Sequence, residues 1–336
     1  MTVSGTRRAG WTLALFLAVF VSALALLPWI GAERLAWPEI AAYVSDGQRT
    51  AHGLILIHQR LPRILLALLV GGALSLTGAA LQVLFRNPLA EPWTLGVAGG
   101  AAVGAFLPMA FPALAAAGGA WGAAPLLSLL GAGGAMAVAW SFARRPGCVS
   151  TQALLLAGVT LSIVSGGAVM LLVYFISPFE VASFHRWMLG GLDVVGYKEL
   201  LAVLSLGLPG MLLLASQARE YNHLAFNEEM ALGQGVDVAR VKRLTFLGAG
   251  LTTAACVSAA GPIGFVGMIV PHIVRRLAGS DHRIVLPCSF LLGGAVLALC
   301  DGIARTVIAP TEIPVGIITA VIGGPAFLFL LARRAP

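Results

Sequence analysis

Residues that could carry out chemistry are sparse in this chain and form no familiar catalytic pattern. A P-loop needs GxxxxGK followed by Ser or Thr, because backbone amides and the lysine hold the phosphates. The two lysines, Lys198 and Lys242, are followed by Glu199 and Arg243, so neither completes that motif. No HExxH or GxSxG pattern occurs. The histidines are scattered along the chain: His52, His58, His185, His223, His272 and His282. The sequence therefore predicts no catalytic residues, no metal site, no cofactor bound by this chain and no ATP hydrolysis by the chain alone.

Two other features of composition could indicate a function, and neither does so. The four cysteines, Cys148, Cys256, Cys288 and Cys300, show no CxxC or Cys/His spacing, and three fall in or beside apolar runs. Buried, inert thiols are the expected state of such residues. The net charge of +7 could suggest nucleic acid. No basic run carries interleaved aromatic residues, so we predict no nucleic-acid partner.

A few charged residues lie near the apolar runs, and their surroundings can be predicted. Asp301 and Arg305 are four residues apart and share a helix face, which predicts a local ion pair. Glu312 precedes Pro314 at the start of the last apolar run, where the helix dipole favours an acidic residue.

The longest polar segment, residues 218–237, has the capping signals of a short helix. Asn227 is a suitable N-cap, and Glu228 and Glu229 lie in the first turn, where the helix dipole favours them. Gly233 and Gly235 then end the helix. The next helix begins at about residue 238. This corner is either an ordinary solvated loop or a docking element for a cytoplasmic partner.

The elements that must position these residues are membrane helices. The chain is 59% hydrophobic and 10% charged, and its mean hydropathy is +0.93. An apolar run of ~20 residues spans ~30 Å of hydrocarbon as a helix. Ten such runs cover residues 11–31, 64–85, 94–113, 120–143, 152–176, 198–216, 244–261, 263–275, 284–304 and 314–332, the eighth being short. We expect an all-α polytopic membrane protein, a bundle of about ten transmembrane helices forming one domain over residues 1–336. The first run is expected to be an uncleaved anchor.

A polar turn with two prolines separates the second and third runs. It reads Asn87-Pro88-Leu89-Ala90-Glu91-Pro92. Each proline lacks an N–H group and disfavours helix in the residue before it, so the turn must lie between two membrane helices.

The distribution of Lys and Arg predicts the orientation of the bundle, because cytoplasmic loops carry an excess of both. With the N-terminus inside, the inner side receives Arg7, Arg8, Arg86, Arg144, Arg145, Arg219, Arg240, Lys242, Arg243, Arg275, Arg276, Arg283, Arg333 and Arg334. The outer side receives Arg34, Arg49, Arg60, Arg63, Arg186, Lys198 and Arg305. This asymmetry predicts that both termini are cytoplasmic.

Six motifs, in order and at matching spacing, resemble the FecCD family of permease subunits. They are RLPR (60–63), NPLAEP with the following LGV, EEMALGQGV (228–236), GPIGFVGMIVPHIVR (261–275), DHR (281–283) and EIPVGIITAVIGGPAF (312–327). The resemblance covers nearly the whole chain. It implies a type II ABC importer for ferric siderophores, haem or cobalamin. Two copies of the permease would pair around a central pathway, with two cytoplasmic ATP-binding subunits below and a periplasmic substrate-binding protein above. ATP with Mg²⁺ would be used by the ATPase subunit.

The resemblance also implies three functional regions. Arg60, Arg63 and Arg305 match positions that dock the binding protein, and we expect their charges at the outer rim. The ATPase-coupling residues would be Glu228, Glu229, Met230, Leu232, Gly233 and Gly235. The loop containing Ser150, Thr151 and Gln152 is similar to the cytoplasmic gate, although Ser150 or Thr151 could equally serve as a helix N-cap.

The segment from Gly261 to Arg275 permits two interpretations. Gly261-Pro262 should break the chain at the outer surface, after which a short helix returns inward. Pro271 leaves one carbonyl unpaired, which is tolerable where a neighbouring helix or water satisfies it. The segment is either a kinked packing helix or an element that transmits ATPase closure to the pathway.

The expected function is therefore that of a permease subunit in the bacterial inner membrane, which moves a haem or ferric siderophore from periplasm to cytoplasm. Cobalamin is the alternative cargo. An ion-coupled secondary transporter is the main rival class, but such proteins place ionisable groups at the bilayer midplane. The apolar runs contain almost none.

Overall fold

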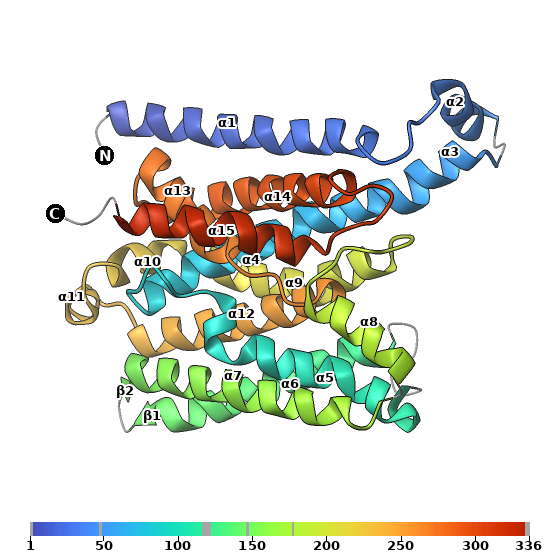
Figure 1. Cartoon of the computed structure of the whole chain (residues 1–336). Coiled ribbons are helices and arrows are strands. Elements are labelled where there is room, and N and C mark those ends of the chain that lie inside the picture. The colour runs from blue at the N-terminus through green and yellow to red at the C-terminus, as the bar shows by residue number, and fades with distance from the viewer. Residues whose placement is uncertain (1–2, 47–48, 116–121, 146–147, 177, 333–336) are drawn as a thin grey trace.

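The computed structural model describes residues 3–46, 49–115, 122–145, 148–176 and 178–332, which are mostly helical (Figure 1). One antiparallel pair of two-residue strands, β1 (Arg144–Arg145) and β2 (Cys148–Val149), is a small departure from the all-α prediction. The longer helices are α1 (Val3–Leu26), α4 (Leu61–Leu84), α6 (Ala123–Ala143), α7 (Thr151–Val173), α9 (Lys198–Ser216), α12 (Val238–Ala260), α14 (His282–Thr306) and α15 (Val315–Ala332). The shorter elements are η1 (Leu27–Trp29), α2 (Trp37–Ser45), α3 (Ala51–Leu54), η2 (Ile55–Arg60), η3 (Pro92–Leu95), α5 (Val97–Ala110), α8 (Pro178–Met188), α10 (Ala218–Leu224), α11 (Glu228–Gly233) and α13 (Val266–Ala278).

Each predicted apolar run contains one helix, but the helices differ in length. Within the described residues, seven segments are long and apolar enough to cross a membrane. The helices α5 and α13 have 14 and 13 residues, fewer than the ~20 that a full crossing needs. Both follow segments rich in glycine and proline, which shorten the helical part of the run.

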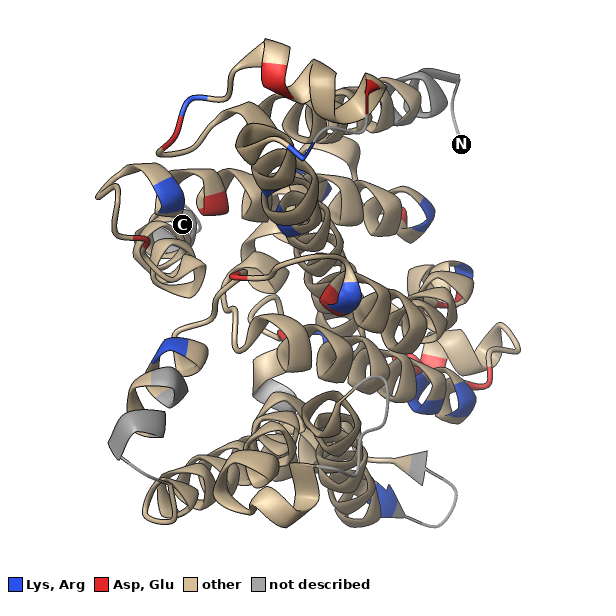
Figure 2. Ribbon diagram, turned by 90° about the vertical axis from the view of Figure 1, so that its right-hand side faces the viewer, with Lys and Arg blue, Asp and Glu red and all other residues tan. Residues whose placement is uncertain are grey.

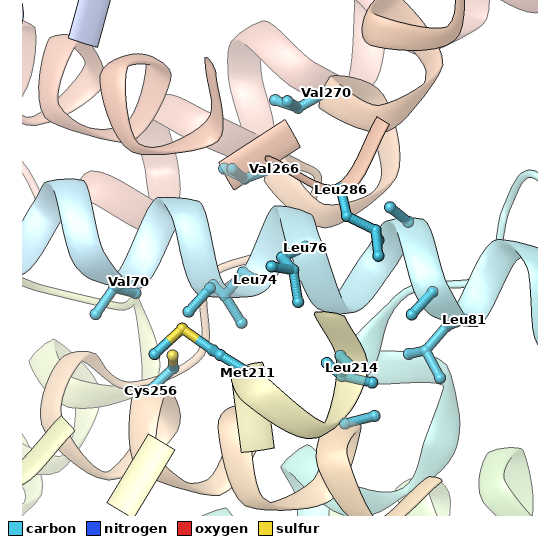
Figure 3. Close-up of a cluster of buried hydrophobic side chains, with 14 of the residues drawn as sticks. Val70, Leu74, Leu76, Leu81, Met211, Leu214, Cys256, Val266, Val270 and Leu286 are labelled. Atoms are coloured by element: carbon cyan, nitrogen blue, oxygen red, sulfur yellow. The ribbon is translucent and has the colours of Figure 1, made fainter. Parts of the chain in front are cut away.

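The helix α4 forms the centre of the bundle, because its sequence after Arg63 carries no charge and almost every residue can be buried. Figure 3 shows α4 side chains such as Leu74 and Leu76 near Met211 of α9, Val266 of α13 and Leu286 of α14. In a bilayer such contacts stabilise the fold through close packing, since lipid is as apolar as the side chains.

Close approach of α4 and α13 depends on a pair of glycines. A Cβ atom added at Gly78 would lie 1.9 Å from the carbonyl oxygen of Gly267. Any side chain at Gly78 would therefore force the two helices apart, and the small residues let the backbones touch.

The start of α13 confirms the expected irregularity and shows how its polar backbone is satisfied. Gly261 ends α12 with φ of +64°, close to the Trp187 carbonyl, and α13 then begins at Val266 beside α4. Pro271 cannot bond the carbonyl of Gly267, four residues earlier. The side-chain amide of Gln82 donates to this carbonyl at 3.4 Å and to that of Met268 at 3.1 Å. A neighbouring helix thus replaces the missing backbone bond, and Arg275 in turn donates to Gln82.

The two ends of the bundle carry different elements. In Figure 1, the start of α1, the end of α15, the β1–β2 pair, α10 and α11 lie at one end, called here the α11 end. The elements α2, α3 and α8 lie at the opposite end, called the α8 end. Figure 2 views the bundle from the α8 end and shows short blue and red stretches on ribbons that are mostly tan.

Candidate functional site

Arg63 is the centre of a charged cluster at the α8 end. It lies in the first turn of α4, and its guanidinium contacts carboxylates from three other segments. Nη2 of Arg63 lies 2.9 Å from Asp301 of α14, and Nη1 lies 2.6 Å from Glu312 and 3.1 Å from Asp193. The carboxylate of Asp301 is completely buried, whereas Asp193 and Glu312 are partly exposed. A fully desolvated carboxylate needs such a partner, because burying an unpaired charge is costly.

The other two predicted docking arginines join the same region. Arg305 lies 3.0 Å from Asp301, which confirms the predicted i,i+4 pair, and it donates to the carbonyl of Ile30. Arg60 donates to the carbonyls of Pro28 and Glu33. The structure brings all three arginines together around a cavity of about 410 Å³, whose lining also includes Asp193 and Glu312.

The three predicted docking arginines are buried in this chain. Arg60, Arg63 and Arg305 are 7%, 9% and 4% exposed, respectively. Carboxylates and carbonyls of the chain itself hold them, so the region is a mixed-charge cavity instead of a simple basic patch. The predicted role of Glu312 at the start of the last helix is also incomplete, since its carboxylate pairs with Arg63 and α15 begins only at Val315.

The predicted coupling corner at the α11 end has the expected backbone. Asn227 caps α11, accepting a hydrogen bond from the Glu229 N–H group at 3.3 Å, and the helix ends at Gly233. Gly235 adopts φ of +82°, a conformation that favours glycine. The corner projects from the bundle next to α10 (Figure 1).

Apolar side chains on this corner are exposed in the isolated chain. Met230 and Leu232 are both more than half exposed, as is Phe226, which the sequence prediction did not include. Large apolar side chains clustered outside the bundle are typical of a surface that binds another protein. The sequence feature that could have pointed to Phe226 is its position directly before the N-cap Asn227, at the edge of the predicted corner.

The predicted gate loop lies against the coupling corner. Ser150 caps α7, because its hydroxyl accepts a hydrogen bond from the Ala153 N–H group, and Thr151 is the first residue of the helix. The hydroxyl of Thr151 donates to Glu228 at 3.1 Å. Gln152 is exposed. Two regions predicted separately, 77 residues apart at these positions, are therefore in direct contact.

Lys242 is a residue at this contact that sequence reasoning missed. Its ammonium donates to Glu228 at 2.7 Å and to the carbonyl of Val149 at 2.8 Å. Sequence reasoning used Lys242 only to exclude a P-loop and as one of the inner positive charges. One sequence feature could have indicated its role. A lysine near the start of a buried helix needs an acidic partner, and Glu228 is among the nearby acidic residues.

Comparison with known proteins identifies the class of this chain. The model of the FecCD transport family matches residues 14–333. The chain is 42% identical over 304 residues to the cobalamin import system permease protein BtuC of Halobacterium salinarum, covering 89% of this chain and 80% of that protein. It is 39% identical over 287 residues to the hemin transport system permease protein HmuU of Yersinia pestis, covering 83% and 84%.

A solved structure gives the same result for the fold. It is described as an inward-facing conformation of a metal-chelate type ABC transporter, and it matches with a TM-score of 0.84 and 31% sequence identity over 96% of this chain and 98% of that one. The chain therefore belongs to the FecCD transport family: it is a permease subunit of an ABC importer, a multi-pass protein of the inner membrane and a transport component, not an enzyme.

Proposed function

We propose that this chain forms the translocation pathway for a metal chelate, which it carries from periplasm to cytoplasm. The observation that carries this proposal is the likeness, over almost the full length of both chains, to a metal-chelate type ABC transporter. The helices cross the membrane ten times if α5, α13 and α15 are counted with the seven longer segments, and both termini are cytoplasmic. The α11 end then faces the cytoplasm and the α8 end faces the periplasm. The excess of Lys and Arg predicted for the inner side supports this orientation.

The proposed cargo is a haem or ferric siderophore, with cobalamin as the alternative. Relatives named for hemin and for cobalamin match at 39% and 42% identity, so both classes of chelate fit the scaffold. Binding assays on the partner binding protein with haem, a ferric siderophore and cobalamin separate these cargoes. Tight binding of a small uncomplexed solute instead would contradict the chelate proposal.

The proposed assembly contains two copies of this single-domain chain and two ATP-binding subunits. One face of α7, including Leu156, Ile163, Val164 and Leu171, is exposed in the single chain and is available to a second copy across the pathway. At the α11 end, Met230 and Leu232 offer apolar contacts to a groove on the ATPase, and Glu228, Glu229, Gly233 and Gly235 shape the corner that enters it. Bound ATP and Mg²⁺ belong to that partner.

The cavity at the α8 end is the proposed docking site for a carboxylate of the binding protein. Arg305 supports this role, because its buried Nη2 atom has no hydrogen-bond partner among the described residues. Glu312 and Asp193 are exposed enough to give way, and a carboxylate of the binding protein would take their place beside Arg63. Guanidinium groups suit this exchange because they hold carboxylates in a fixed geometry.

The loop at Ser150, Thr151 and Gln152 is the proposed cytoplasmic gate. Small hydroxyl and amide side chains can line a narrow wet constriction without adding a fixed charge. A Gln152→Cys variant should crosslink between the two copies in one nucleotide state and not in another. Equal crosslinking in all states would contradict a moving gate.

Assembly provides the direct test of the partner proposal. The chain, its ATPase and its binding protein should copurify, with two permease chains and two ATPase chains per particle. ATP hydrolysis should belong to the assembled particle and respond to the loaded binding protein. A monodisperse permease that transports the chelate without any ATPase would overturn the proposal.

A further inference from the structure

Lys242 is a buried cation whose partners come from two different functional regions. It lies in the second turn of α12, and its side chain is 3% exposed. Its two hydrogen bonds reach Glu228, the first residue of α11, and the carbonyl of Val149, two residues before α7 begins. The ammonium group therefore joins the coupling corner to the loop that leads into the predicted gate.

Glu228 completes this junction from the other side. One of its carboxylate oxygens accepts from Lys242, and the other accepts from the Thr151 hydroxyl at 3.1 Å. Arg86, in the turn after α4, lies 3.7 Å from the latter oxygen. The four residues Glu228, Lys242, Thr151 and Arg86, with the Val149 carbonyl, are called here the Glu228 junction.

The rest of the corner is attached to other helices. Tyr221 of α10 is buried and bonds Thr245 of α12 at 2.9 Å. Asn222 of α10 donates to Asp281 and accepts from the His282 N–H group, both at 2.8 Å, which fixes α10 to the start of α14. The helix α10 is thus braced against α12 and α14, whereas Glu228 links α11 to the start of α7.

We propose that Lys242 is a positioning residue for energy coupling, which makes the start of α7 follow the movement of α11. This inference rests on the proposed roles of the α11 corner in ATPase docking and of residues 150–152 in gating. Movement of α11 alone would pull Glu228 away and leave the buried ammonium with the Val149 carbonyl.

The cost of that separation gives the proposal its physical basis. A buried ion pair adds little net stability compared with an apolar pair, but removing one partner is strongly unfavourable because the remaining charge is uncompensated. The lowest-energy path therefore keeps Glu228, Lys242 and Val149 together. A displacement of the corner by the ATPase is then passed directly to the gate loop.

A merely structural brace makes different predictions from a coupling element. Loss of a brace would lower the amount of folded protein but leave the ratio of transported chelate to hydrolysed ATP unchanged in the molecules that fold. Loss of a coupling element lowers this ratio. It also makes the accessibility of the gate loop independent of the nucleotide state.

The test uses the full permease–ATPase complex in liposomes with the binding protein and haem, a ferric siderophore or cobalamin, whichever the parent complex carries. The variants are Lys242→Met, which keeps the length of the side chain without the charge, and Glu228→Gln, which keeps its shape. The matched control is Arg243→Met, since Arg243 is the exposed neighbour of Lys242 on α12. We measure uptake per ATP hydrolysed and nucleotide-dependent crosslinking of Gln152→Cys in each background.

We expect Lys242→Met to lower uptake per ATP by about tenfold, which is within the usual range of allosteric coupling. Crosslinking at position 152 should become similar in all nucleotide states. Glu228→Gln should cause a smaller loss in the same direction, and Arg243→Met should match the parent. If Lys242→Met does not accumulate in the membrane, Glu228→Gln decides the question.

An unchanged uptake per ATP in the Lys242→Met and Glu228→Gln complexes, with gate crosslinking still dependent on nucleotide, would overturn the inference. So would equal losses in the Arg243→Met control. Failure of the proposed function would give a different result. The parent complex itself would then show no ATP-driven uptake, or its Gln152→Cys variant would crosslink equally in every nucleotide state.

Discussion

Arg63 and Asp301 are 238 positions apart in the sequence, yet Nε of the arginine donates to Oδ1 of the aspartate at 2.9 Å. This contact fastens the start of α4 to the end of α14. Asp301 also pairs with Arg305, so one buried carboxylate contacts two of the three arginines proposed to dock the binding protein.

Asp301 should be more important for stability than the other acidic residues of this cluster. We expect Asp301→Asn to lower the free energy of unfolding by ~3–5 kcal/mol, because it removes the buried carboxylate that pairs with Arg305 and with Arg63. Asp193→Asn should change it by ~1 kcal/mol or less, since this carboxylate is mostly exposed and exposed pairs contribute little. Thermal unfolding of the two variants in the same detergent compares them. Equal losses would contradict the central role of Asp301.

Binding-protein affinity should depend on Arg63 and Glu312 in opposite directions. Glu312→Gln removes an internal competitor for the Arg63 guanidinium, so the binding protein should bind more tightly at low salt. Arg63→Gln should weaken binding by about tenfold and reduce its salt dependence, because paired interface charges mainly act through electrostatic attraction. Surface plasmon resonance at two salt concentrations measures both effects. Unchanged affinity in both variants would show that this cavity is not the docking site.

Gly233 and Gly78 should respond oppositely to added side chains. A Cβ atom at Gly233 meets nothing within 4 Å among the described residues, so Gly233→Trp should fold normally but no longer fit the ATPase groove. Gly78→Ala adds much less volume but collides with the Gly267 carbonyl, and it should destabilise the bundle. Copurification with the ATPase and thermal unfolding separate the two effects. Normal transport by Gly233→Trp would show that this corner is not part of the ATPase-coupling site.

Asp281 should make stability depend on pH. Burial would raise the pKa of Asp281, but hydrogen bonds from Asn222 and from the Arg283 N–H, with the charges of Arg283 and His282, outweigh it and lower the pKa. A carboxylate with a lowered folded-state pKa stabilises the fold above its unfolded value, about 3.9, and this contribution is lost as pH falls through the folded pKa. Asp281→Asn should therefore lose stability at neutral pH and approach the parent in acid. Parallel melting curves for parent and variant from about pH 3 to pH 7 would contradict this.

The elements that the sequence predicted well are those set by local rules. A run without charges, such as 64–85, has few places other than a membrane or a core, and it became the buried helix α4. Asn227 and Gly233 likewise predicted the start and end of α11 because capping depends on adjacent residues. Both features can be read without knowing which helices are neighbours.

The contacts that the sequence could not predict join distant segments. Nothing local distinguishes a docking arginine at a rim from Arg63 paired to Asp301, since that contact depends on how α4 packs on α14. Lys242 and Glu228 are 14 residues apart and lie on different helices, so no helix spacing relates them. The burial of the arginines could not be predicted for the same reason: the carboxylates and carbonyls that contact them come mostly from other segments of the chain.

Uptake in proteoliposomes tests the central claim most directly. Vesicles containing the permease and its ATPase, with chelate-loaded binding protein outside, would be supplied with internal ATP or, separately, with a proton or sodium gradient alone. We predict chelate accumulation with ATP and none with either gradient in the absence of ATP. Accumulation driven by an ion gradient without ATP or the ATPase would contradict the assignment as an ABC importer permease.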